Sequence, residues 1–165
     1  MGAELANGEY YFDDIQNHFN KSREFKTENE LCDYLDMNME SLCDQLKIDY
    51  KSHEREAYMT MMKKFGANIP RIDFLIKDKD GEYILLEVKK PNGRPREVIM
   101  SIAQLLDYYL ISENAGYKIK KAYILTTQVN KSFTAIAERF NLPIGLILFS
   151  KRKIAVWEKG VADNG

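Results

Sequence analysis

Two acidic residues and a lysine, Asp73, Glu87 and Lys89, occur in two strand-like segments of this 165-residue sequence. The segments, 71–76 and 82–89, flank a turn that ends in glycine, a pattern that is typical of a β-hairpin. Carboxylate oxygens are hard ligands for magnesium, and an ammonium group beside them can orient a water molecule or stabilise charge on a phosphate. The residue types therefore point to hydrolysis assisted by a divalent cation, provided that the hairpin brings them together.

The register of the hairpin decides which charged side chains meet. If Gly81 takes the left-handed conformation of a three-residue turn, Asp73 faces Glu87 across the hairpin. Directly opposed acids repel each other, and a divalent cation between them would compensate for the repulsion. Lys89 shares a face with Glu87 because side chains alternate along a strand. The hairpin is thus predicted to place two carboxylates and an ammonium group on one surface, with Mg²⁺ or Mn²⁺ as the cofactor.

The alternative interpretation of these charges is a surface ion pair. An isolated Glu-x-Lys sequence is common, and on a half-exposed strand it contributes little. Here, however, residues 84–86 and Val88 are apolar, so the strand is predicted to be buried on both faces. An uncompensated charge is costly in such a place, which favours a functional role. If the chain were instead an unrelated α/β domain, Asp73 and Glu87 would point into solvent, far apart.

The elements around the hairpin follow from hydrophobic periodicity and capping residues. Thr27 to Glu30 reads as a capping box, and apolar residues at helical spacing predict a helix over 27–47, which a polar connection joins to the hairpin. The remaining predicted elements are a helix over 97–113, a strand over 121–127, a helix over 132–141 and strands over 144–149 and 154–157. Their alternation predicts an α/β fold with a mixed central sheet flanked by helices.

Composition limits the class of protein. The residues of the chain are 45% hydrophobic and 30% charged. The sequence has no apolar run long enough to span a membrane and no signal sequence at its start. We therefore expect a cytoplasmic protein without a membrane partner. Cys32 and Cys43 would lie about 16 Å apart on one helix, too far to pair, which fits a reducing compartment. Residues 1–60 carry 14 acids and 6 bases, whereas residues 61–165 carry 18 bases and 11 acids, and this basic part is compatible with a polyanionic partner.

Ile72-Asp73 followed by Glu87-Val88-Lys89 resembles the motif of the PD-(D/E)xK nuclease superfamily. The pair Gln104 and Tyr108, four residues apart on the next predicted helix, resembles the Gln-x-x-x-Tyr motif of its RecB-like and NucS-like branch. The resemblance covers about residues 27–127, although Arg71 displaces Pro70 from the usual Pro-Asp position. It implies a restriction-endonuclease-like αβββαβ core and a metal-dependent nuclease that hydrolyses phosphodiester bonds. DNA is the expected substrate.

The resemblance also implies roles for individual residues. Asp73 and Glu87 would bind Mg²⁺ or Mn²⁺ together with the backbone carbonyl of Val88, and Lys89 would activate or position water. Gln104 and Tyr108 would lie near the metal and the scissile phosphate.

A third acid is expected on the preceding helix in this family. Both Glu28 and Glu30 are candidates. We choose Glu28, because it lies on the face of the apolar residues of the helix, whereas the capping box with Thr27 explains Glu30.

Four basic residues near the predicted site are candidates for contacts with the nucleic-acid backbone: Arg71, Lys90, Arg94 and Arg96. The expected domain organisation is an arm or helix over 1–26, a nuclease-like domain over 27–160 and a tail over 161–165. The sequence leaves open RNA in place of DNA, a homodimer, and a catalytically silent nucleic-acid-binding or assembly protein on the same fold.

Overall fold

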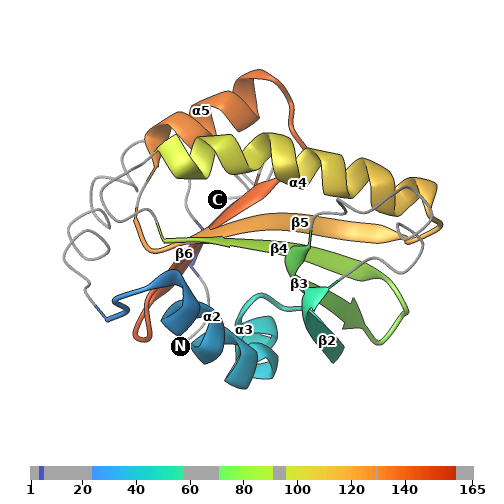
Figure 1. Cartoon of the computed structure of the whole chain (residues 1–165), viewed down its shortest axis with the longest axis horizontal. Coiled ribbons are helices and arrows are strands. Elements are labelled where there is room, and N and C mark those ends of the chain that lie inside the picture. The colour runs from blue at the N-terminus through green and yellow to red at the C-terminus, as the bar shows by residue number, and fades with distance from the viewer. Residues whose placement is uncertain (1–3, 6–23, 58–70, 91–95, 129, 159–165) are drawn as a thin grey trace.

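A central sheet of seven strands is covered by helices on both faces, as the computed structural model shows (Figure 1). The structure describes residues 4–5, 24–57, 71–90, 96–128 and 130–158. From one edge to the other, the strands are β1 (Glu4–Leu5), β7 (Ile154–Trp157), β6 (Gly145–Phe149), β5 (Ile119–Thr126), β4 (Tyr83–Lys89), β3 (Ile72–Asp78) and β2 (Tyr50–Ala57). The helices are α2 (Glu28–Met37), α3 (Met39–Gln45), α4 (Arg96–Asn114) and α5 (Lys131–Arg139).

The sheet is mixed, as predicted. Strands β2, β3 and β4 are antiparallel to one another, whereas β4, β5 and β6 run parallel and are joined through α4 and α5. Helices α4 and α5 lie over one face of the sheet, and α2 and α3 lie over the other (Figure 1). The predicted α/β class and the order αβββαβ are therefore confirmed.

The β3–β4 hairpin has the predicted register. Phe74 pairs with Leu86 and Leu75 with Leu85, and continuing this register by one residue sets Asp73 opposite Glu87. Gly81 has φ +81°, the left-handed conformation that the three-residue turn requires. Its N–H donates to the carbonyl of the residue at the start of the turn, at 3.2 Å. The glycine therefore fixes which charged residues meet at the far end of the hairpin.

The core has two layers, one on each face of the sheet. Leu85 and Ile124 pack in the layer under α4 and α5, whereas Leu86 and Leu125 pack in the layer under α2 and α3. Strand β4 contributes to both layers, so the prediction that it is buried on both faces is confirmed. Glu87 belongs to the same face as Leu85, which is the face that α4 covers.

The prediction of one continuous helix over 27–47 was wrong, because two helices meet at Asn38. The Asn38 side chain donates to the carbonyl oxygen of Tyr34 at 2.8 Å, and its backbone N–H also donates to carbonyls of the last turn of α2. Asparagine competes in this way with continued helical hydrogen bonding. Cys32 and Cys43 therefore lie on different helices, and both are buried and free.

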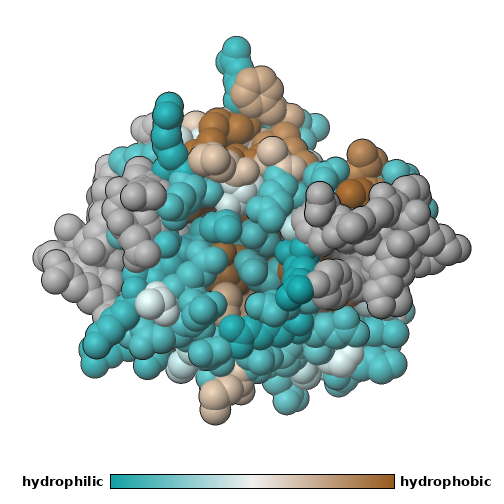
Figure 2. All heavy atoms as spheres, viewed as in Figure 1, coloured by the Kyte–Doolittle hydropathy of each residue, from teal (hydrophilic) through white to brown (hydrophobic). Residues whose placement is uncertain are grey.

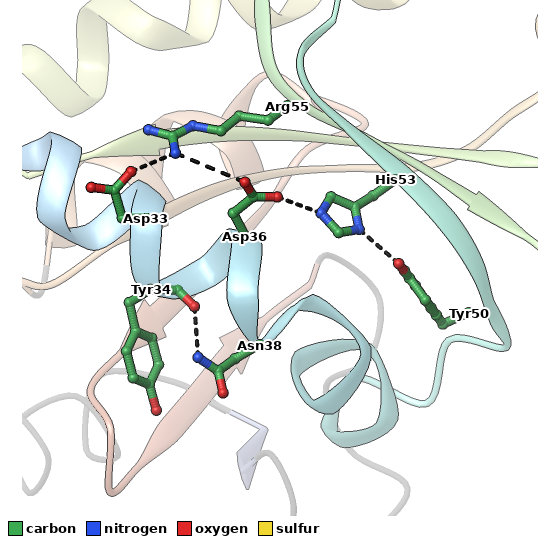
Figure 3. Close-up of polar contacts among 7 residues, drawn as sticks. All are labelled: Asp33, Tyr34, Asp36, Asn38, Tyr50, His53 and Arg55. Atoms are coloured by element: carbon green, nitrogen blue, oxygen red, sulfur yellow. Dashed lines mark hydrogen bonds and ion pairs between the residues drawn. The ribbon is translucent and has the colours of Figure 1, made fainter.

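Of the longer strands, β2 is the one that the hydrophobic pattern did not predict. It lies at the edge of the sheet, where only one neighbour is needed and the outer side meets solvent, so its residues are mostly polar. Figure 3 shows what joins it to α2: His53 Nε2 lies 2.7 Å from Asp36 Oδ1, and His53 Nδ1 lies 2.7 Å from the hydroxyl of Tyr50. Arg55 of the same strand pairs with Asp33. These contacts hold α2 against the edge of the sheet.

The outer surface is mostly hydrophilic on the face shown in Figure 2, with apolar side chains gathered along its upper edge, where α4 and α5 lie. None of the helices in the described part of the chain is long and apolar enough to cross a membrane. Residues 161–165 and most of 1–26 lie outside the described residues, so the predicted tail and arm remain predictions.

Candidate active site

The acidic residues and the lysine of the hairpin come together at the ends of β3 and β4. The Glu87 side chain is almost completely buried, with 2% of the residue exposed, and its Oε1 lies 3.5 Å from the ammonium nitrogen of Lys89. The carboxylate of Asp73 reaches across to β4, where its Oδ2 accepts a hydrogen bond of 2.7 Å from the Val88 N–H. The alternative in which Asp73 and Glu87 point into solvent, far apart, is therefore wrong.

Burial makes this cluster electrostatically unusual. Burial, reinforced by the charge of Asp73, raises the pKa of Glu87 to about 8. Burial also raises the pKa of Asp73, and the charge of Glu28 adds to the effect. For Lys89, burial lowers the pKa, but attraction to Glu87, Glu28 and Asp73 outweighs it and leaves the pKa above its ordinary value. Two carboxylates in one buried place thus resist ionising together unless a cation compensates.

Glu28 of α2 reaches the same end of β4. Its Oε2 accepts a hydrogen bond of 3.2 Å from the backbone N–H of Lys90. The neighbouring Glu30 forms the predicted capping box with Thr27, in which Glu30 N–H donates to the threonine hydroxyl and the Glu30 carboxylate accepts from the Thr27 N–H. The geometry thus brings Glu28 rather than Glu30 to the cluster.

Gln104 and Tyr108 of α4 are hydrogen-bonded to each other. Gln104 Nε2 donates to the Tyr108 hydroxyl at 2.9 Å, and this hydroxyl donates to the carbonyl oxygen of Arg71, also at 2.9 Å. Burial raises the pKa of Tyr108 to about 12, with a further contribution from the charges of Glu87 and Asp73. The pair therefore lies beside the acids, but the tyrosine hydroxyl donates its hydrogen bond to the backbone that leads into β3.

Three of the four basic residues predicted to contact a nucleic acid lie in the described part of the chain. Arg71 is half exposed and lies 3.5 Å from Glu56 Oε2. Lys90 directly follows β4, and Arg96 is exposed at the start of α4. Arg94 lies outside the described residues. Arg71 and Lys90 thus adjoin the strands that carry the acids, whereas Arg96 lies on the next helix.

The cluster fits a magnesium-type ion better than a transition metal. Glu87 Oε2 is buried and has no hydrogen-bond partner among the described residues, so one carboxylate oxygen is left for a ligand. No group of three or more His, Cys, Asp or Glu side chains within the described ranges is placed to hold a metal ion. Magnesium needs no such cage, because it commonly binds one or two carboxylates and keeps several waters. Asp73 and Glu87 satisfy that requirement.

A further polar residue, Thr126, ends β5 beside this cluster and was missed from the sequence. It pairs with Lys89 in the parallel ladder of β4 and β5, and its hydroxyl is buried. The sequence carries no signal for this pairing, because the register of parallel strands that are joined through a helix is not set by any local turn.

Comparison with known proteins gives few relatives. No protein-family model matches the chain, and no curated protein matches it. Among solved structures, it is similar to a repair endonuclease from Pyrococcus abyssi, at 16% identity and a TM-score of 0.47, over 74% of this chain and 47% of that one. It is also similar to the protein of an EndoMS–dsDNA2 complex, at 17% identity and a TM-score of 0.46, over 80% of this chain and 50% of that one. The chain spans about half the length of either structure.

Proposed function

We propose that this chain hydrolyses phosphodiester bonds in DNA with the help of Mg²⁺ or Mn²⁺. The observation that carries the proposal is the buried Glu87 carboxylate, which has one oxygen beside the Lys89 ammonium and the other without a partner among the described residues, across the hairpin from Asp73. A structural ion pair does not need a second, like-charged acid at the same buried place, because the second acid only adds repulsion. A divalent cation between the two acids would compensate for that repulsion.

The residues of the cluster would have two different roles, cation binding and stabilisation of the reacting groups. Asp73 and Glu87, with the Val88 carbonyl, would hold the cation, which when bound polarises the phosphate and lowers the pKa of a bound water. The Lys89 ammonium would orient the water or stabilise negative charge on the phosphate oxygens.

Three residues around the proposed cation ligands would keep the strands of Asp73 and Glu87 in place. Glu28 fixes the end of β4 through the Lys90 N–H. Gln104 and Tyr108 fix the start of β3, which carries Asp73, through the Arg71 carbonyl. Both contacts act on the backbone next to a proposed cation ligand, so both would set the separation of Asp73 and Glu87.

DNA as the substrate is supported by the motif resemblance and by the basic residues on the bordering segments. Arg71 directly precedes β3 and Lys90 directly follows β4, the two strands that carry the acids, and Arg94 and Arg96 follow next in sequence. Contacts to phosphate carry no base information, so this part of the proposal concerns affinity and not sequence preference.

Cleavage of linear, circular and single-stranded DNA by the purified chain tests the proposal. We expect cutting with Mn²⁺ and none with EDTA, and we expect Asp73→Asn to lose at least about 100-fold in rate, because it removes one charged ligand. Asp107→Asn, at an exposed position of α4, is the matched control and should cut normally. Undiminished cleavage in EDTA, or by Asp73→Asn, would rule the proposal out.

The alternative is a nucleic-acid-binding or assembly protein that keeps the fold without catalysis. The observation in its favour is that no third metal-binding side chain joins Asp73 and Glu87 within the described part of the chain. Calorimetric titration with Mn²⁺, alongside a DNA-binding assay, separates the two. Retained DNA affinity without any Mn²⁺ binding would favour the alternative.

A further inference from the structure

Two buried side-chain polar atoms have no hydrogen-bond partner among the residues that the structure describes, and they occupy neighbouring strands. They are Glu87 Oε2 and Thr126 Oγ1. In the ladder of β4 and β5, Glu87 pairs with Ile124 and Lys89 pairs with Thr126. Paired residues of neighbouring strands point to the same side of a sheet, and so do residues two apart on one strand. Glu87, Lys89 and Thr126 therefore share one face, with Thr126 diagonal to Glu87.

The two atoms are closed to solvent, and their neighbours on this face are apolar residues and Lys89. Thr126 is 0% exposed, and Leu85 and Ile124 on the same face belong to the core under α4 and α5. A buried hydroxyl and a buried carboxylate oxygen are each destabilising without a partner, so each requires a polar group within hydrogen-bond distance. A DNA phosphate is too large to reach a fully buried hydroxyl, whereas a single buried water molecule commonly satisfies two to four such groups.

We infer that Thr126 is a positioning residue for the Glu87 carboxylate. Its hydroxyl and Glu87 Oε2 share one buried water molecule, and this water fixes the rotation of the carboxylate while Oε1 stays beside Lys89. A carboxylate oxygen has two lone pairs, so Oε2 can accept from this water and still bind the cation. The inference rests on the proposed function, because a fixed carboxylate matters only if Glu87 binds a cation. Residues that hold metal-binding carboxylates in place typically change metal affinity or activity tenfold or more when they are removed.

Substitutions of Thr126 in the full chain separate the hydroxyl from the shape of the side chain. Thr126→Val keeps the shape and removes the hydroxyl, whereas Thr126→Ser keeps the hydroxyl. In calorimetric titrations with Mn²⁺, we expect about tenfold weaker binding for Thr126→Val and a return to within about threefold of the wild type for Thr126→Ser. In DNA cleavage, kcat should fall for Thr126→Val with little change in KM, because the hydroxyl does not touch DNA.

Two further variants serve as controls. Thr127→Val removes the next buried hydroxyl along the chain and should bind Mn²⁺ as the wild type does. Thr126→Ala removes the same hydroxyl with a smaller side chain, and it decides the question if Thr126→Val does not fold. Circular dichroism establishes folding for each variant before titration.

Different outcomes would overturn the role of Thr126 and the proposed function. Wild-type Mn²⁺ affinity in Thr126→Val and Thr126→Ala, or affinity in Thr126→Ser as weak as in Thr126→Val, would overturn the role of Thr126 and leave the proposed function intact. A wild-type chain that binds no Mn²⁺ would overturn the proposed function, and the role of Thr126 with it.

Discussion

Glu87→Gln is expected to abolish cleavage and, at the same time, to stabilise the metal-free protein at about pH 9. Glutamine has the shape of the protonated glutamate, and the folded state holds that proton until about pH 8, because burial and Asp73 raise the pKa of Glu87. The unfolded chain releases the proton near its ordinary value of 4.5. The folded state therefore binds more protons between these two values, so the wild type loses stability as the pH rises through this window.

The expected stabilisation is large and depends on pH. Each pKa unit corresponds to about 1.4 kcal/mol, so ionisation of Glu87 lowers the free energy of unfolding of the wild type by on the order of a few kcal/mol at about pH 9. We therefore expect Glu87→Gln to melt about 5 to 10 °C higher at that pH. At about pH 5 the two proteins should melt within about 2 °C of each other, because Glu87 is then protonated in the folded state. Thermal unfolding by circular dichroism in EDTA measures both differences.

The matched control for this substitution is Glu113→Gln, at an exposed position near the end of α4. It should change neither cleavage nor the melting temperature at either pH, because an exposed carboxylate keeps its solvation. A melting temperature of Glu87→Gln below that of the wild type at about pH 9 would show that the ionised carboxylate is a stabilising partner and not a strained ligand group.

Lys89→Met is expected to lower the cleavage rate by about 100-fold to 1,000-fold without weakening the binding of Mn²⁺. Methionine keeps most of the length of the side chain and removes the ammonium, which lies 3.5 Å from Glu87 Oε1. Removing a group that stabilises charge in the transition state has an effect of about this size. Mn²⁺ should bind as tightly or more tightly, because a neighbouring positive charge repels the cation.

The two measurements on Lys89→Met separate catalysis from metal binding. Rates come from DNA cleavage with saturating Mn²⁺, and affinity comes from calorimetry. Lys121→Met is a suitable control, because Lys121 pairs with Glu158 at 3.0 Å and lies opposite Ile84, three residues along β4 from Glu87. Cleavage by Lys89→Met at the wild-type rate would end the proposed role of the lysine.

The hairpin and its charges were accessible from sequence because every determinant is local. The turn glycine sets the register, alternation sets the faces, and the apolar residues on both sides of Glu87 predict its burial. The capping box likewise separated Glu30, which binds Thr27, from Glu28, which reaches the end of β4. Apart from the contact of Glu28 with Lys90, the interacting residues are neighbours in the chain or are joined by one short turn.

Two of the missed features depend on contacts between distant segments, and the third depends on one side chain that interrupts a helix. Strand β2 is polar because it lies at the edge of the sheet, and its pattern alone resembles a loop. The break at Asn38 replaces one helix with two, although the apolar spacing continues through it. Thr126 meets Lys89 only because α4 returns the chain to the sheet in parallel register. Local periodicity contains no information on any of these three arrangements.

The central claim is that one divalent cation binds between Asp73 and Glu87. Anomalous diffraction from crystals of the chain soaked in Mn²⁺ tests this claim most directly, because manganese gives a peak that water and magnesium do not. We expect one strong peak within coordination distance of a carboxylate oxygen from each residue. A Mn²⁺-soaked crystal with no peak between these two side chains, or with a peak at other residues only, would contradict it.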